Sequence, residues 1–243
     1  MYRYLMLRIR ARPGKDRELQ NTVEATRERS RLGNQIKANS PLASMALRRK
    51  ELEMALQKVR NFNDPDPSLE QYMTPAWMAS EIVFEAYRLG DVEGMKVIDL
   101  GCGTGMFSIG AWLMGAGMVR GFDTSDAALS VARLNAEELG ADVEFVQCDV
   151  SQVSEGADTV FMNPPFGCQT RRADRPFLDK AIECAEVVYS IHMANSLDFV
   201  REYVESKGRR IDSYKTYKYE IPHTFAFHKR TKMAVDVAAV RIR

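Results

Sequence analysis

The chain lacks any long hydrophobic run: no stretch of its 243 residues approaches the ~18 consecutive apolar residues that cross a bilayer. The apolar patch within Met1–Arg8 is too short for the core of a signal peptide, and no small-residue cleavage site follows it. We therefore expect a cytoplasmic protein without membrane segments. With 45% hydrophobic and 28% charged residues, the composition fits one globular α/β domain with additions.

Metal-binding and disulfide patterns are also missing. The four cysteines are Cys102, Cys148, Cys168 and Cys184. They form no CxxC pair, and the three histidines have no metal-ligand spacing with them. We expect reduced thiols and no metal site, with Cys102 as a small packing residue rather than a nucleophile.

A formal net charge of +1 conceals an uneven distribution of charge. Residues 1–60 contain 15 Lys and Arg against 6 Asp and Glu, and residues 207–243 contain 10 against 3. Residues 61–206 contain only 9 Lys and Arg against 24 Asp and Glu. Basic ends on an acidic middle favour contact with a polyanion, and solvated surface charge is an equally good explanation.

Hydrophobic periodicity predicts alternating strands and helices from about residue 96 onward. The expected strands are 96–100, 119–122, 143–147, 159–162, 188–192, 210–219 and 234–242. The expected helices are 45–59, 75–89 with Thr74 as N-cap, 106–114, 126–139, 176–187 and 197–205. This order predicts an α/β, Rossmann-like parallel sheet with helices on both faces, ending in an antiparallel hairpin.

A glycine-rich turn follows the first strand of this alternation. Gly101, Gly103 and Gly105 allow positive φ and close approach of the backbone to a ligand. Such a turn by itself fits a dinucleotide or S-adenosylmethionine. Asp99 would repel a pyrophosphate but favour a sulfonium or ammonium group, and GxGxxG spacing and a P-loop lysine are absent. The turn therefore predicts an S-adenosylmethionine site.

The next two strands also end in carboxylates. Asp123 is placed to accept hydrogen bonds from ribose hydroxyls, and Asp149 to accept one from the adenine amine, with Val150 beside the ring. Each carboxylate could instead be a helix cap or a turn residue. Three at successive strand ends favour a ligand site, because strand ends converge at one edge of such a sheet.

The fourth strand ends in Asn163-Pro164-Pro165-Phe166. An exocyclic amine is a weak nucleophile because its lone pair is delocalised into the ring. The Asn163 side-chain oxygen and the Pro164 carbonyl could hold both of its hydrogens, which would aim the lone pair at a methyl donor. The prolines stiffen this loop, and Phe166 could stack on the acceptor base. We predict that these four residues form the catalytic loop and that Asn163 also borders the cofactor.

At this point the chain resembles class I S-adenosylmethionine-dependent N-methyltransferases, and more narrowly those that modify an adenine N6 in small-subunit ribosomal RNA. The segments that carry the resemblance are 69–74, 99–103, 146–150, 162–167, 188–192 and 227–229. It implies a seven-stranded methyltransferase sheet over residues 45–243, with Gln71, Tyr72 and Thr74 covering the cofactor. Eukaryotic members need a small zinc-ribbon activator, so the resemblance also implies a comparable partner.

Basic residues near the catalytic loop and between the last two strands suit contacts with RNA phosphates. The predicted RNA-binding residues are Arg171, Arg172, His228, Lys229, Arg230 and Lys232. Residues 1–44 are an additional basic extension, either an RNA-contacting arm or the product of a start codon assigned before Met45. For Tyr189–His192 the sequence leaves a core role and an acceptor-pocket role open.

The sequence thus favours transfer of a methyl group to the N6 amine of an adenine in ribosomal RNA. Because the Asn163 loop also suits an amide, a protein glutamine-N5 or DNA adenine-N6 methyltransferase is the first alternative. The second is a noncatalytic RNA-binding factor that retains a cofactor fold, which the four intact polar site residues disfavour.

Overall fold

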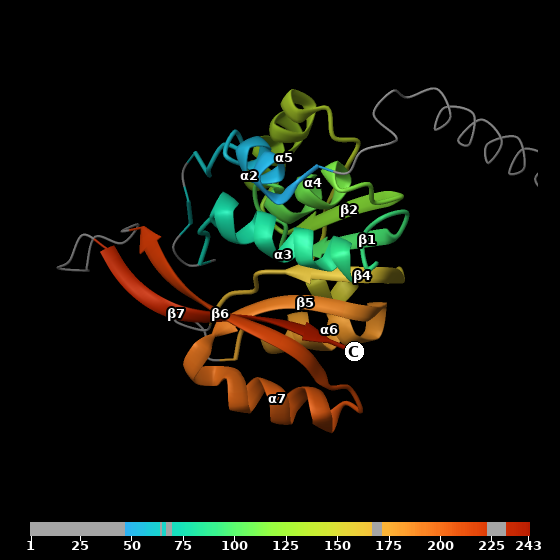
Figure 1. Ribbon diagram of the computed structural model, residues 1–243, viewed down its shortest axis with the longest axis vertical. Coiled ribbons are helices and arrows are strands. Elements are labelled where there is room, and N and C mark those ends of the chain that lie inside the picture. The colour runs from blue at the N-terminus through green and yellow to red at the C-terminus, as the bar shows by residue number, and fades with distance from the viewer. Residues whose placement is uncertain (1–46, 64, 67–69, 167–171, 223–231) are drawn as a thin grey trace, which may run out of the picture. The chain divides into compact units, whose positions relative to one another are not determined.

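The computed structural model describes residues 47–63, 65–66, 70–166, 172–222 and 232–243 (Figure 1). These residues lie in the second of two compact units of the chain, Ala46–Arg243. The predictions for residues 1–44 therefore lie outside the described residues. Within the described part, no helix has the length and apolar character needed to cross a membrane.

A seven-stranded sheet forms the centre of this unit, with strand order β3-β2-β1-β4-β5-β7-β6. The strands are β1 (Lys96–Leu100), β2 (Met118–Asp123), β3 (Glu144–Gln147), β4 (Ala157–Met162), β5 (Ala185–Met193), β6 (Ile211–Pro222) and β7 (Lys232–Ile242). The first five are parallel, whereas β7 runs antiparallel to β5 and β6. The predicted fold class, including the C-terminal antiparallel pair, is confirmed.

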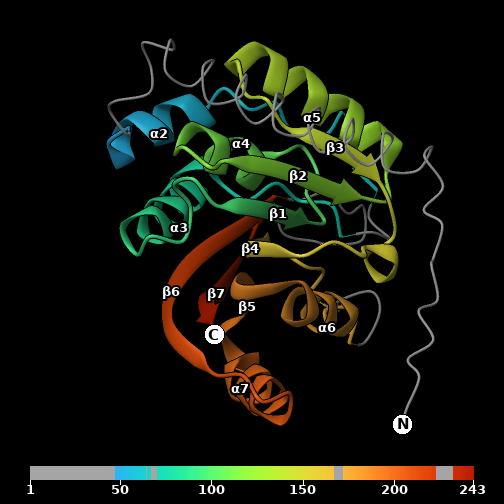
Figure 2. The same cartoon turned by 90° about the vertical axis from the view of Figure 1, so that its right-hand side faces the viewer.

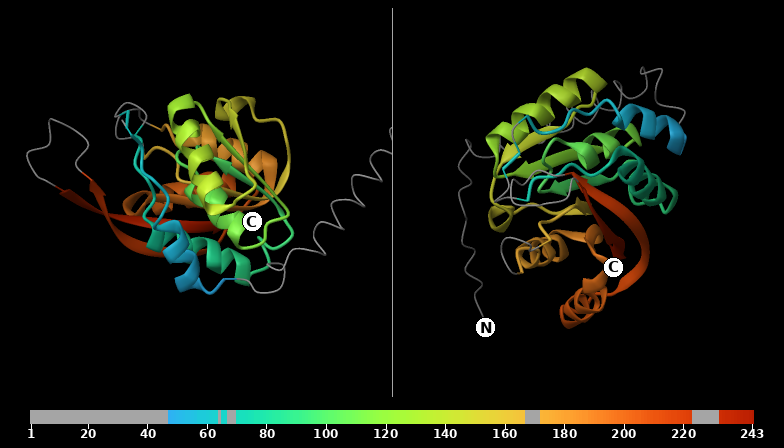
Figure 3. Two further views of the ribbon diagram at one scale, coloured as in Figure 1. Left: turned by 90° about the horizontal axis from the view of Figure 1, so that it is seen from above. Right: turned by 90° about the vertical axis from the view of Figure 1, so that its left-hand side faces the viewer.

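Helices cover both faces of the sheet (Figure 2). They are α2 (Arg49–Leu56), α3 (Ala76–Arg88), α4 (Met106–Leu113), α5 (Asp126–Leu139), α6 (Arg175–Cys184) and α7 (Leu197–Ser206), with short 3-10 turns η2 (Val150–Gln152) and η3 (Ala194–Ser196). Residues of α2 to α5 share one apolar core and those of α6 and α7 share another. α2 and α3 lie side by side, as two further views show (Figure 3). The sheet is therefore covered on both faces, and every residue of β1 from Val97 to Leu100 is buried.

Local sequence signals predicted some helix ends correctly and others incorrectly. α5 begins where the Ser125 side chain accepts a hydrogen bond from the Ala128 amide, and it ends at Gly140 in the left-handed conformation. Three predicted helix bounds were wrong. The helix expected over 45–59 spans only Arg49–Leu56. α3 begins one residue late, with Pro75 instead of Thr74 as N-cap. The predicted helix 176–187 ends at Cys184 because residues 185–187 pair with β4 as part of β5.

A buried ion pair fastens the C-terminal hairpin to the parallel strands. Arg241 of β7 donates from Nε and Nη2 to the two carboxylate oxygens of Asp91, at 2.9 and 3.0 Å. The Tyr189 hydroxyl donates to the same carboxylate at 2.5 Å, and Arg241 Nη1 donates to Asp212 of β6. This network brings together α3's trailing loop and three strands, which no local sequence signal indicated.

Candidate active site at the carboxyl ends of the strands

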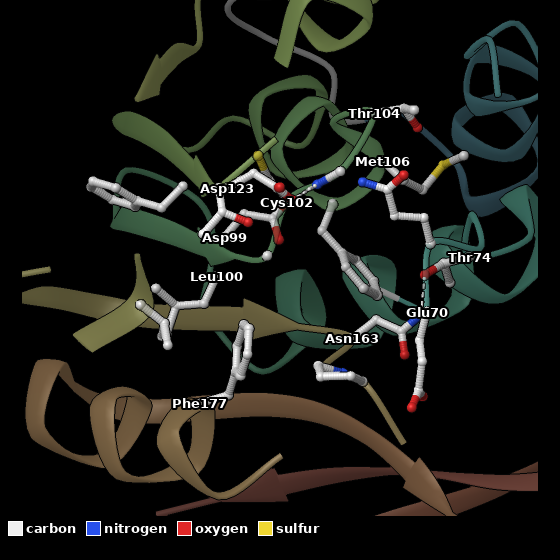
Figure 4. A pocket seen from close by; sticks show the side chains of 18 of the residues that line it. Glu70, Thr74, Asp99, Leu100, Cys102, Thr104, Met106, Asp123, Asn163 and Phe177 are labelled. Carbon is white, nitrogen blue, oxygen red and sulfur yellow. Dashed lines mark hydrogen bonds between the residues drawn. The ribbon is translucent and has the colours of Figure 1, made fainter. Parts of the chain in front are cut away.

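A cavity of about 370 Å³ opens where β1, β2 and β4 end (Figure 4). Eleven of the predicted site residues line it: Gln71, Tyr72, Thr74, Asp99, Gly101, Gly103, Asp123, Asp149, Val150, Asn163 and Pro165. The other residues that line it are Phe62, Glu70, Met73, Leu100, Cys102, Thr104, Met106, Phe107, Phe122, Thr124, Cys148, Ala173 and Phe177. The cavity therefore unites motifs that are up to about 100 residues apart in the chain.

The glycine turn forms one wall of this cavity. Gly103 has φ +53, and a Cβ placed on it would lie 2.9 Å from the ring of Phe62. Gly101 has φ +68, and a Cβ there would lie 3.0 Å from the ring of Phe177. Gly105 lies behind the wall as the left-handed N-cap of α4. At Gly101 and Gly103, side chains would close the space that the glycines keep open.

Asp99 lines the cavity, is buried, and also accepts hydrogen bonds from within the protein. Its Oδ2 accepts hydrogen bonds from the amide and hydroxyl of Ser108, at 2.9 and 2.6 Å. Burial raises the pKa of this carboxyl to about 7, although the Ser108 bonds oppose the rise. A carboxylate held in this way is a strong potential partner for a cation.

The other two predicted carboxylates also make local hydrogen bonds. Asp123 accepts from the amides of Gly103 and Ser125, both at 2.9 Å, and burial raises its pKa. Asp149 accepts from the amide and hydroxyl of Ser151, which lower its pKa. Turn and cap roles, which the sequence left as alternatives, are therefore present in residues that also line the cavity.

The loop after β4 places an unsatisfied oxygen at the cavity. Asn163 donates from Nδ2 to the Thr74 hydroxyl at 3.0 Å, as Figure 4 shows. Its Oδ1 is buried, and the described residues give it no hydrogen-bond partner. Phe166 is half-buried, with its ring 5.3 Å from that of Tyr72 and its amide 2.7 Å from the Glu70 carboxylate. Pro164 and Phe166 do not line the cavity itself.

Four of the six predicted RNA-binding residues lie outside the part of the chain that the structure describes. Arg171, His228, Lys229 and Arg230 lie outside the described residues. Lys232 is the first residue of β7 rather than part of the connection between the strands, and its side chain is not described. Arg172 is exposed and has φ +66. Among the described residues, no cluster of His, Cys, Asp and Glu could hold a metal ion.

Comparison with known proteins identifies the fold and its cofactor. A sequence-family model described as "Methyltransferase domain" matches residues 91–214. The rRNA N(6)-adenosine-methyltransferase METTL5 of Danio rerio is 36% identical over 79% of this chain and 97% of its own length. The chain belongs to the class I S-adenosylmethionine-dependent methyltransferases.

Solved structures agree with this assignment. A candidate RNA methyltransferase from Pyrococcus horikoshii superposes on this methyltransferase with a TM-score of 0.76. It is 42% identical, and the match covers 82% of this chain and 98% of that one. The tRNA (uracil-54, C5)-methyltransferase of Pyrococcus abyssi, solved with S-adenosyl-L-homocysteine, is 26% identical with a TM-score of 0.50, over 70% of this chain and 39% of that one. S-adenosylmethionine is the cofactor of this methyltransferase.

The cavity of this methyltransferase fits that cofactor. Asp99 and Asp123 could hold cationic and hydroxyl groups, since both line the cavity with carboxylate oxygens. Gly101 and Gly103 leave room for close approach of the backbone. When bound, S-adenosylmethionine supplies an electrophilic methyl group. Burial raises the pKa of the Cys102 thiol in the same turn, which makes it a poor competing nucleophile.

Proposed function

We propose that this methyltransferase transfers a methyl group to the N6 amine of an adenine in RNA, with small-subunit ribosomal RNA as the substrate. The observation that carries the proposal is the buried, unpartnered Oδ1 of Asn163 beside the cavity. A buried acceptor without a partner is costly, and a ligand that donates a hydrogen bond removes this cost. The METTL5 relative of Danio rerio, an rRNA N(6)-adenosine-methyltransferase, supports an adenine amine as that donor.

Asn163 is proposed to orient the acceptor rather than to remove a proton from it. The bond from Nδ2 to Thr74 fixes which way the amide faces, so that Oδ1 is left for the substrate. The Pro164 carbonyl is the proposed second acceptor, and Pro165 restricts the backbone that presents it. Phe166 is the proposed stacking surface for the base, and the Tyr72 ring supports it from behind.

The remaining predicted residues are proposed to bind the cofactor. Asp99 would hold its cationic end, Asp123 the ribose hydroxyls, and Asp149 with Val150 the adenine. Gln71, Tyr72 and Thr74 would cover the site. Residues 45–243 are the proposed catalytic domain. The RNA-binding roles given to the basic residues, the role of residues 1–44 and a zinc-ribbon activator stay predictions.

Cofactor affinity is expected to depend on pH through Asp99. Because its pKa is about 7, much of the free protein carries a protonated Asp99 at pH 6, and binding a cation requires loss of that proton. The association constant for S-adenosylmethionine should therefore rise roughly tenfold from pH 6 to pH 8. Titration calorimetry would measure it. Asp99→Asn should bind weakly and flatten this dependence; an unchanged slope in that variant would assign the titration to another group.

The substrate class is tested by methyl transfer from labelled S-adenosylmethionine to total RNA and total protein from cells that lack this gene. Nucleoside analysis should show N6-methyladenosine in small-subunit ribosomal RNA. Label in glutamine of a protein would replace this proposal by the glutamine alternative. If no label appears although the cofactor binds, the assay is repeated with a candidate zinc-ribbon partner, and a second absence of label would reject RNA methylation.

A further inference from the structure

A buried polar trio lies next to the acceptor loop, Asn163–Phe166, and takes no part in the mechanism proposed above. His192 Nε2 lies 2.7 Å from the Ser190 hydroxyl, and His192 Nδ1 lies 3.6 Å from Asp174 Oδ2. Ser190 is 1% exposed and His192 2%. Burying a polar group destabilises the fold unless the group has a polar partner. The trio therefore favours one relative position of the elements that carry its three residues.

The trio joins β5 to the N-terminal end of α6. β4 pairs with β5 as far as Met162 and Ser190, after which β5 continues to Met193. His192 therefore lies beyond the end of β4, on the side where the acceptor loop leaves the sheet. Because side chains alternate along a strand, His192 and Ser190 share the face covered by α6 and α7 (Figure 2).

Asp174 is the residue that brings this contact to the loop segment. It is the N-cap of α6, a position where an aspartate usually accepts from the helix amides. Here its side chain makes no capping bond and lies instead near His192. Its neighbours in sequence and along the helix, Ala173 and Phe177, line the cofactor cavity. A contact at Asp174 therefore holds part of the cavity wall, while Ser190 pairs in register with Met162, the residue directly before the acceptor loop.

Two residues with strained backbone lie close in contact or in sequence to the parts that this trio concerns. Glu70 and Arg172, with φ +51 and +66, are the non-glycine residues with positive φ in the part of the chain that the structure describes. Glu70 accepts a hydrogen bond from the Phe166 amide of the acceptor loop, and Arg172 lies two residues before Asp174. Non-glycine residues keep such conformations only where their surroundings impose them, commonly at functional sites.

We propose that Ser190, His192 and Asp174 form a polar anchor that positions the acceptor loop against the cofactor cavity. Glu70 holds the other end of the loop through its hydrogen bond with the Phe166 amide. Ser190, His192 and Asp174 are positioning residues: they act through the acceptor loop and touch neither substrate nor cofactor. The inference rests on the proposed function, because it assigns the loop to the methyl acceptor. Its geometric part can be tested without any acceptor.

Hydrogen exchange of the full chain, followed by mass spectrometry, tests that geometric part. Asp174→Ala should speed exchange of the Asn163 and Phe166 amides, and of the non-proline amides in 172–178, about tenfold, while α4 exchanges at the wild-type rate. Asp174→Asn keeps an acceptor oxygen and should change these rates less than about threefold. Thr159→Val is the matched control, because it removes a buried 2.6 Å bond to the Asp91 carbonyl elsewhere in the sheet. It should leave exchange of the loop unchanged.

Kinetics then test whether the anchor serves catalysis. With total RNA as acceptor, Asp174→Ala should lower kcat about tenfold, and the dissociation constant of S-adenosylhomocysteine should change less than about threefold. Unchanged local exchange, or faster exchange throughout the domain, would overturn the anchor. If wild-type protein methylates no RNA, the proposed function fails, and the exchange result still decides the anchor independently.

Discussion

Asn163→Ala is expected to lower kcat by roughly 10²–10³-fold, because it removes a fixed acceptor aimed at the reacting amine. The affinity for S-adenosylhomocysteine should stay within a few-fold, since the other cavity-lining residues stay in place. Single-turnover methyl transfer measures the first quantity and titration calorimetry the second. Turnover at the wild-type rate would remove Asn163 from the proposed mechanism.

Thr74→Val is the matched control for that experiment. It keeps the Asn163 amide and the size of the neighbouring side chain but removes the hydroxyl that accepts from Nδ2. The amide is then free to turn, so kcat should fall by about tenfold, less than in Asn163→Ala. If kcat fell equally in both variants, the Asn163 amide would contribute to catalysis only when Thr74 holds its orientation.

Arg241→Met is expected to have the largest effect on stability. The substitution leaves Asp91 buried without its cation, and breaking a buried pair in this way costs about 3–5 kcal/mol. For a domain of this size, Tm should fall by roughly 10 °C. Arg241 is 6% exposed and Asp91 9%, so solvent cannot replace the lost partner. Thermal unfolding followed by circular dichroism measures the shift.

Lys215→Met provides the comparison. Lys215 of β6 pairs with Glu81 of α3, and the lysine side chain is 62% exposed. This pair also joins the hairpin to the rest of the domain, but water solvates both charges, so its loss should cost less than about 1 kcal/mol. Equal melting temperatures for Lys215→Met and Arg241→Met would show that burial does not strengthen the Asp91 network.

Residues at the carboxyl ends of the parallel strands could be assigned to the cavity from the sequence. Asp99, Asp123, Asp149 and Asn163 each lie at or just after the carboxyl end of a parallel strand, and all four line the cavity. Strand pairing brings these ends to one edge whatever the rest of the chain does. The helix predicted over 176–187 is present but ends at Cys184, because its last three predicted residues belong to β5, which pairs with β4, and tertiary pairing overrides local propensity.

Residues that reach the cavity from other segments had no comparable signal. Phe62 lies over Gly103 and Phe177 over Gly101, yet in the sequence each is one aromatic residue among many. Glu70 belongs to a segment that the family resemblance singled out, but its bond to the Phe166 amide spans 96 positions. Such contacts depend on how segments pack, which periodicity and spacing do not encode.

The sequence by itself determined the fold class, the order of the elements and which strand-end residues line the cavity, because those follow from local pattern and parallel pairing. Tertiary structure alone decided which groups hold that chemistry in place. The pair Arg241–Asp91, 150 positions apart, and the contact between His192 and Asp174 exist only once β5, β7 and α6 are packed together. Long-range polar contacts depend on the folded geometry, and burial strengthens each of them because the interior screens charge less than water does.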